Sequence, residues 1–301
     1  MKTFNIKKIL IPLDFSETAL LALEHGAYMA SLFKAEIILL HVIKPNLVAY
    51  NMENIPMSMP IDIVQYQEET ASQRLQECSE KIRKEFSVKI KTQYETGFVC
   101  STIISIAEKE NADLIIMGTH GISGFAERFI GSNAYRVVNE STCPVITIQT
   151  HAKRKGFKDI VLPIDHSFYS RQKIHHAIEL AERYGSKIHI LGLSHTEDEM
   201  EVNKLKIKIE QAEEFIGKHG IEFDTQINFG TNYAKLTMSY AEIIMADLTI
   251  IMTEWEEDLT GLFIGPFARQ VVNHSKIPVM SIRPEAKPEL VESGMLWMEQ
   301  H

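Results

Sequence analysis

One apolar pattern occurs twice in this chain. Residues 9–14 read ILIPLD and residues 160–165 read IVLPID, at an offset of 151 positions. A later run, residues 144–148, returns as residues 278–282 at an offset of 134 positions. The two offsets differ because the second copy lacks the proline-rich stretch at 45–61 of the first. A tandem duplication explains this pattern, so the sequence predicts two copies of one fold.

In each copy, short apolar runs alternate with segments that have the periodicity of amphipathic helices. The strand-like runs are rich in β-branched residues and nearly continuous, which is typical of strands covered on both faces. Residues 62–86 repeat apolar side chains every three to four positions and predict a long helix. Residues 100–111 predict a shorter helix. The strands expected in the first copy are at 8–14, 36–43, 88–95 (an edge strand), 114–117 and 144–150.

This order predicts an α/β protein with parallel sheets. We expect two tandem Rossmann-like domains, each a five-stranded, mainly parallel sheet with helices on both faces. The expected limits are 1–150 for the first domain, 157–284 for the second, and 285–301 for a C-terminal tail. Ligands of such sheets bind at the carboxyl ends of the strands, where the strand order reverses. The strand ends expected to meet there are those at Asp14, Val42 and Gly118.

A glycine-rich stretch follows the strand at 114–117. Gly118, Gly121, Gly124 and Gly131 fall within 14 residues, and a helix-like segment begins at Ser132. Glycines let backbone N–H groups approach an anion closely, and the first turn of a helix directs unpaired N–H groups and a partial positive charge toward it. The pattern predicts a phosphate site. It has neither the Gly-Lys-Ser/Thr of a P-loop nor the Gly-x-Gly-x-x-Gly spacing.

The spacing Gly118-x2-Gly121-x9-Gly131-Ser132 resembles the nucleotide loop of universal stress proteins, and the resemblance covers the chain through about Arg283. It implies an adenine nucleotide alpha hydrolase-like fold that holds ATP, or AMP or ADP, in the first domain, with Mg²⁺ bound through the nucleotide. It also implies that Asp14 lies near the adenine and ribose. The expected site residues are Pro12, Leu13, Asp14, Val42, Met117, Gly118, Thr119, Gly121, Arg128, Gly131, Ser132 and Asn133.

Several of these residues have a simpler interpretation. The glycines could serve only to shape a turn, and Asp14 could only cap a helix. Arg128 could reach a phosphate or lie on the surface, and the sequence leaves both open. We expect a structural role for His120, because no nucleophile or second titratable group accompanies it. For Asp165, the second-copy counterpart of Asp14, we expect helix capping.

The second copy does not repeat the glycine pattern. Aligning Met117 with Met252 places Thr253 and Glu256 opposite Gly118 and Gly121 and makes the second loop one residue shorter. Pro266 stands where the first copy has Ser132, and proline has no N–H to offer a phosphate. Four carboxylates also lie in this loop, at Glu254, Glu256, Glu257 and Asp258. The sequence therefore predicts that only the first domain binds nucleotide and that the second is structural.

Net charge, apolar run length and cysteine pattern limit the kinds of partner and compartment expected for this chain. A net charge of −9 at pH 7 argues against nucleic acid or an anionic membrane as the main partner. No apolar run approaches the ~20 residues of a membrane span, and no signal-peptide pattern opens the chain. The three cysteines include no Cys-x-x-Cys, which suits a cytoplasmic protein. The resemblance implies that the last strands of the two domains pair within the chain; whether a further homodimer forms is left open.

Three functions remain at this point. The first is a nucleotide-binding regulator or sensor of the stress response, acting through an unidentified protein partner. The second is a slow ATPase that uses the same pocket, and the third is an interaction protein that binds no nucleotide. The first copy shows no general base and no pair of metal-binding carboxylates beside the glycine loop. We therefore assign no catalytic residue and expect little or no ATP hydrolysis.

Overall fold

A computed structural model describes residues 4–45, 61–119, 131–152, 154–167, 169–253, 255–258 and 261–284. Side chains are described in these ranges except at 61–63, 255–258 and 261–264. Two expected site residues, Gly121 and Arg128, lie outside the described residues, as do His120, Glu254 and the tail at 285–301.

The first half of the chain alternates strands and helices as the sequence predicts. Its long helix and its edge strand fall within one residue of the expected bounds at each end. The elements are β1 (Lys8–Pro12), α1 (Glu17–Phe33), β2 (Glu36–Ile43), α2 (Ile61–Phe86), β3 (Lys89–Thr96), α3 (Val99–Glu110), β4 (Leu114–Gly118), α4 (Ser132–Glu140) and β5 (Val145–Ile148).

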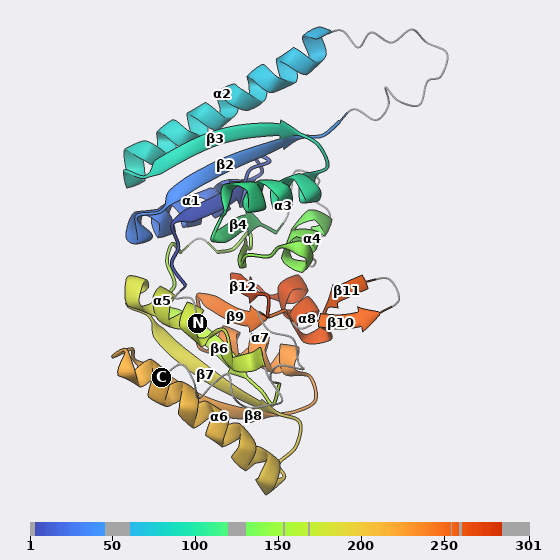
Figure 1. Cartoon of the computed structure of the whole chain (residues 1–301). Coiled ribbons are helices and arrows are strands. Elements are labelled where there is room, and N and C mark those ends of the chain that lie inside the picture. The colour runs from blue at the N-terminus through green and yellow to red at the C-terminus, as the bar shows by residue number, and fades with distance from the viewer. Residues whose placement is uncertain are drawn as a thin grey trace.

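The second half repeats this order with two additions, a short 3₁₀ helix η2 and a hairpin. Its elements are β6 (Asp159–Ile164), η2 (Tyr169–Arg171), α5 (Ile174–Tyr184), β7 (Lys187–Ser194), α6 (Glu199–Lys218), β8 (Phe223–Phe229), α7 (Tyr233–Ile243), β9 (Leu248–Met252), β10 (Trp255–Asp258), β11 (Gly261–Ile264), α8 (Pro266–His274) and β12 (Val279–Ile282). β10 and β11 pair antiparallel and extend beside α8 (Figure 1).

Ten of the described strands form one sheet in the order β3-β2-β1-β4-β5-β12-β9-β6-β7-β8. Strands within each half are parallel, and the halves join where β5 and β12 pair antiparallel, with Met280 opposite Ile146. The predicted pairing of the last strands within one chain is therefore confirmed. Figure 1 shows the two halves on either side of this seam.

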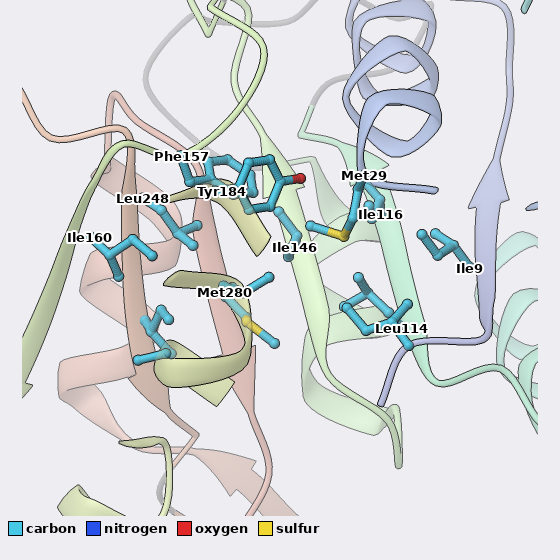
Figure 2. Close-up of a cluster of buried hydrophobic side chains, with 14 of the residues drawn as sticks. Ile9, Met29, Leu114, Ile116, Ile146, Phe157, Ile160, Tyr184, Leu248 and Met280 are labelled. Carbon is cyan, nitrogen blue, oxygen red and sulfur yellow. The ribbon is translucent and has the colours of Figure 1, made fainter. Parts of the chain in front are cut away.

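Helices cover both faces of the sheet. Buried side chains of α1, α2, α5 and α6 form one hydrophobic core with the sheet, while α3, α4, α7 and α8 pack on the other face. The first core crosses the seam without a break: Phe157 and Tyr184 from the second half face Met29 and Ile146 from the first (Figure 2). Burial of apolar surface across the seam stabilises the association of the two halves. In the described part of the chain, no helix is long and apolar enough to cross a bilayer.

Candidate functional site

A cavity of about 740 Å³ lies at the carboxyl ends of the strands in the first half. Strand order reverses there, because the chain runs from β1 to its neighbour β2 on one side and later adds β4 on the other. Open α/β sheets bind ligands at this crevice. The volume lies within the range of roughly 300–1,000 Å³ that small-molecule sites occupy.

The fold brings six separate segments to this cavity, and four of them carry residues expected from the sequence. Of the twelve site residues expected from the sequence, ten line it, and the other two are Gly121 and Arg128, outside the described residues. The ten are Pro12, Leu13, Asp14, Val42, Met117, Gly118, Thr119, Gly131, Ser132 and Asn133.

The N-terminus of α4 forms one end of the cavity. Gly131 is the N-cap, and no side-chain hydrogen bond caps the helix within the described residues. The Gly131 N–H donates to the Thr119 carbonyl over 2.6 Å, which ties the helix start to the end of β4. Ser132, Asn133 and Ala134 of the first turn line the cavity. Their backbone N–H groups have no partner inside the helix, so this end can bind an anion.

Gly118 is required by packing as well as by the cavity. A Cβ atom at this position would lie 2.8 Å from the carbonyl carbon of Thr18 and 2.9 Å from the backbone nitrogen of Ala19. Both are backbone atoms at the start of α1, so they cannot move aside as a side chain would. The glycine therefore lets α1 begin directly against the end of β4.

Asp14 is held in place beside the cavity by the residue that caps α1. Its Oδ1 accepts hydrogen bonds from the backbone N–H of Ser16 over 3.0 Å and from the Ser16 hydroxyl over 2.5 Å. The Ser16 side chain in turn accepts from the Ala19 N–H as the N-cap of α1. Asp14 itself does not cap the helix, so the simpler interpretation of this residue is wrong.

An apolar wall lies between β2 and the helices α3 and α4. Val42, Val99, Ile103, Met117 and Ala134 belong to the core on that face of the sheet and also line the cavity. The side chains of Val42 and Val99 are only partly buried. A wall of this kind can cover the face of a flat ring such as a nucleobase.

The wall opposite, formed by α2, was not anticipated from the sequence. Tyr66, Thr70 and Arg74 line the cavity from this helix, and Phe15 and His41 join them from the strand ends. The i, i+4, i+8 spacing of the three α2 residues places them on one helix face. That spacing was a signal in the sequence, but without the fold nothing tied it to the glycine loop.

Among the described residues of the second half, the counterpart of this cavity has a volume of about 10 Å³. It lies at the equivalent place, because Pro163, Asp165 and Leu193 stand at the offset of 151 from Pro12, Asp14 and Val42. The lining residues are Pro163, Asp165, Ser167, Ser170, Lys173, Leu193, Met252 and Phe267.

Strand register corrects the alignment of the two glycine-loop regions. Gly118 pairs with Ile148 in the first half, and Met252 pairs with Ile282 in the second. The next N–H donates to the same partner in each half, from Thr119 to the Ile148 carbonyl and from Thr253 to that of Ile282. Met252 is therefore the counterpart of Gly118, and the predicted equivalence of Thr253 with Gly118 is wrong.

This register also changes the length of the second loop. Gly118 to Gly131 and Met252 to Gly265 both span 13 positions (131 − 118 and 265 − 252), so the expected shortening is wrong. The counterpart of Gly121 is Trp255, not Glu256. The backbone of 255–258 forms strand β10 of the hairpin, and the carboxylate side chains of Glu256, Glu257 and Asp258 lie outside the described part.

Two substitutions and a shifted helix fill the second cavity. Met252, only 3% exposed, replaces Gly118, and Phe267 packs into the core where the first half has Asn133. Glu17, the first residue of α1, corresponds to position 168, but α5 begins six positions later at Ile174. The intervening segment carries the buried Lys173, whose Nζ donates to the Ser170 carbonyl.

Asp165 does not have the role expected for it. Its Oδ1 accepts from the backbone N–H of Ser167 over 2.9 Å, as Asp14 accepts from Ser16. The N-cap of α5 is Lys173, which makes no side-chain cap hydrogen bond. The prediction that Asp165 caps the following helix is wrong, because the late start of α5 moves the cap position away from it.

The donors around the first cavity fit a nucleotide better than a metal held by the protein alone. The described residues contain no group of three or more His, Cys, Asp or Glu side chains that could hold a metal ion. Asp14 is the one carboxylate among the described residues that line the cavity. A divalent ion at this place would therefore depend on phosphate oxygens for most of its ligands.

The sequence model of the Universal stress protein family matches residues 5–149 and, a second time, residues 156–283. A universal stress protein of Methanocaldococcus jannaschii is 33% identical over 150 residues, which are 49% of this chain and 84% of that protein. The crystal structure of a universal stress protein from Archaeoglobus fulgidus shares the fold over 93% of this chain and 97% of its own, with a TM-score of 0.73 and 23% identity. Another solved universal stress protein, 20% identical and matching 48% of this chain with a TM-score of 0.39, is in complex with cAMP, which is a property of that protein.

Proposed function

The chain belongs to the universal stress protein family, and on that premise we propose that its first domain, residues 1–150, binds an adenine nucleotide. ATP is the expected ligand, with AMP or ADP as alternatives. The second domain, residues 157–284, binds none and serves as the structural partner of the first. The observation that carries this proposal is the contrast between a cavity of about 740 Å³ in one half and a remnant of about 10 Å³ in the other.

The chemistry of the first cavity supports a nucleotide in particular. The N–H groups of Ser132 and Asn133 offer donors to phosphate oxygens at a helix N-terminus, where the helix dipole favours negative charge. The apolar wall at Val42 and Val99 suits a base. In the sheet, β1 lies between β2 and β4, so Asp14 at the end of β1 stands between these two parts of the lining and can accept a hydrogen bond from a ribose hydroxyl. Mg²⁺, when bound through the phosphates, would neutralise part of their charge.

We assign the domain a regulatory role, in which occupancy of the cavity changes the binding of a protein partner. The titratable groups that line the cavity among the described residues are Asp14, His41, Lys44, Tyr66 and Arg74. The ring of His41 is already engaged, since its Nδ1 lies 2.7 Å from the Leu13 carbonyl oxygen. None of these groups combines a free base with a position at the α4 end, so positioned water attack has little support.

Isothermal titration calorimetry of the full chain with ATP and Mg²⁺ tests the proposal. We expect one ATP per chain. Gly131→Val should abolish binding, because the new side chain would extend into the phosphate path. The matched control is Gly265→Val at the equivalent N-cap of α8, which should leave binding unchanged. Absence of ATP binding to the folded wild-type chain, or two ATP per chain with one surviving Gly131→Val, would refute the proposal.

The alternative of a slow ATPase is tested with the same variants. We expect phosphate release well below the ~1–10³ s⁻¹ range of typical enzymes in the wild-type chain. A turnover within that range, abolished by Gly131→Val and retained by Gly265→Val, would establish the enzyme instead of the regulator.

A further inference from the structure

The α2 wall of the cavity carries a cation, Arg74, that has no carboxylate partner in the part of the chain that the structure describes. The Arg74 guanidinium lies over the ring of Phe15, with its central carbon 3.9 Å from the ring centroid. No ion pair joins Arg74 to a carboxylate among the described residues, and its side chain lines the cavity. Stacking on an aromatic ring leaves the N–H donors at the edge of the guanidinium free to bind an anion.

The local backbone is arranged to present this pair. Phe15 has a φ of 64°, in the left-handed region that a bulky residue rarely adopts. Its ring packs on that of His41, at 4.8 Å between centroids, and His41 is fixed by the Leu13 carbonyl. The unusual backbone conformation of Phe15 accompanies a layered stack of His41, Phe15 and Arg74. The guanidinium of the exposed Arg74 therefore stacks on a ring that is itself packed at the cavity.

The charge of the cavity lining, among the described residues, is opposite to that of the whole chain. Lys44 and Arg74 both line the cavity, against the single described carboxylate of Asp14, whereas the chain carries a net charge of −9. The Oδ1 of Asp14 already accepts two hydrogen bonds from Ser16. The α2 wall thus attracts anions, and it is separate from the donors at the N-terminus of α4 because the two belong to helices on opposite faces of the sheet.

We propose that the α2 wall is a second anion subsite, in which Arg74 binds a phosphate that is distinct from the 5′-phosphates at α4. This inference rests on the proposed function, and it names the ligand class as an adenine nucleotide that also carries a phosphate on a ribose hydroxyl. The position of Arg74 supports a phosphate near the ribose. Asp14 is the residue expected beside the ribose, Phe15 follows it directly in the chain, and the Arg74 guanidinium lies on the Phe15 ring. The α2 wall would also accept a free phosphate ion beside a nucleotide that has no phosphate on its ribose hydroxyls.

The test compares two ligands with equal numbers of phosphates, ADP and adenosine 3′,5′-bisphosphate, on the full chain. The variants are Arg74→Gln and, as a control on the same helix, Lys84→Gln, which removes one charge outside the cavity. A hydrogen bond to a charged group changes affinity by about tenfold or more. We expect Arg74→Gln to lower the affinity for the bisphosphate by that factor, with the affinity for ADP and all values for Lys84→Gln unchanged.

A second arm distinguishes the source of the phosphate. Binding of AMP is measured with and without inorganic phosphate. If phosphate raises the affinity for AMP in the wild-type chain and not in Arg74→Gln, the ligand of the α2 wall is a free phosphate ion. Phe15→Gly removes the ring that seats the guanidinium while suiting the positive φ, and it should repeat the effect of Arg74→Gln in whichever arm responds.

The inference is overturned if Arg74→Gln changes the affinities for ADP and the bisphosphate equally. It is also overturned if Arg74→Gln and the wild-type chain have the same affinity for the bisphosphate and the same response to inorganic phosphate. Failure of the proposed function has a different signature. In that case ATP does not bind at all. Binding of inorganic phosphate to the α2 wall can still be measured, from the effect of phosphate on the thermal unfolding of the wild-type chain and of Arg74→Gln.

Discussion

The two halves of this protein share a strand order and differ in what their strand ends enclose. The first half leaves a cavity of about 740 Å³ and the second about 10 Å³ at the equivalent place. Three local changes account for the difference: Met252 for Gly118, Phe267 for Asn133, and the late start of α5. The crevice of a doubly wound sheet is thus only a potential site, and a few side chains decide whether it is open.

The closed half still has a physical role at the seam. β12 is fully buried between β5 and β9, and without the second half β5 would be an exposed apolar edge. An edge of that kind invites aggregation. The larger core that continues across the seam (Figure 2) adds to the same effect. Loss of the cavity therefore leaves the second half with a stabilising function that does not depend on a ligand.

The largest expected effect comes from giving the first half the helix start of the second. The double variant Ser132→Pro, Asn133→Phe copies Pro266 and Phe267 onto α4. Proline fits the first helical position, so the fold should persist, while one N–H is lost and an aromatic ring enters the cavity. We expect ATP affinity, measured by calorimetry, to fall more than about a hundredfold, since roughly 2.7 kcal/mol corresponds to that factor.

The reverse exchange, Pro266→Ser with Phe267→Asn, is the matched control. It should not create a second site, because Met252 and the segment before α5 still occupy the space. A stoichiometry that rises to two ATP per chain would show that the helix start alone closes the second cavity.

The next effect concerns the strand position at which Met252 replaces Gly118. Met252→Ala should lower the free energy of unfolding by roughly 2–5 kcal/mol, because it leaves a void in place of a side chain that is only 3% exposed. Gly118→Ala should cost about 1–3 kcal/mol for the opposite reason, crowding against the backbone of α1. Urea unfolding measures both. A Gly118→Ala variant as stable as the wild type would mean that α1 can move away from β4.

A third prediction uses two histidines at equivalent positions, His25 in α1 and His176 in α5, at the offset of 151. Burial lowers the pKa of His25, although a contact of its Nε2 with the Ala152 carbonyl at 2.6 Å opposes the shift. Burial, with His175 as a smaller cause, lowers the pKa of His176 from 6.5 to about 4. Its ring packs on Phe4 at 4.2 Å between centroids.

Because these pKa values are lower in the folded state, the unfolded chain takes up protons first as the pH falls. The contribution of neutral His176 to the free energy of unfolding is therefore fully present above pH 6.5. It is lost progressively between pH 6.5 and 4, by on the order of 1–3 kcal/mol. His176→Leu should flatten the pH dependence of the free energy of unfolding in this window. An unchanged slope in that variant would show that His176 is not the group that titrates.

The smallest effect should separate the two aspartates. Asp14→Asn should weaken ATP binding by about two- to tenfold, the range for one ordinary hydrogen bond, whereas Asp165→Asn should leave it unchanged. Both variants keep the size of the side chain and the acceptor for the N–H two residues on. Equal calorimetric affinities for the two variants would remove Asp14 from the site.

Much of the fold could be read from the sequence, because short-range periodicity and the internal repeat are properties of neighbouring residues. The apolar runs predicted the central strands, and the pairing of 144–148 with 278–282 is confirmed by the β5–β12 register. Ten expected site residues lie together for the same reason: the carboxyl ends of parallel strands meet at one edge. The limits of the two domains and the ligand itself stay predictions.

What the sequence could not provide was the relation between segments that are far apart in the chain. The presence of methionine at both 117 and 252 favoured an alignment that the hydrogen-bond register shows to be shifted by one residue. The α2 wall depended on the packing of α2 against β2 and β3, which places Arg74 on the ring of Phe15. The closure of the second cavity depended on where α5 begins relative to β6. Sequence patterns determined which elements form, whereas close approach of distant backbones decided which strand end stayed open, because steric fit acts between atoms in contact and not between positions in a sequence.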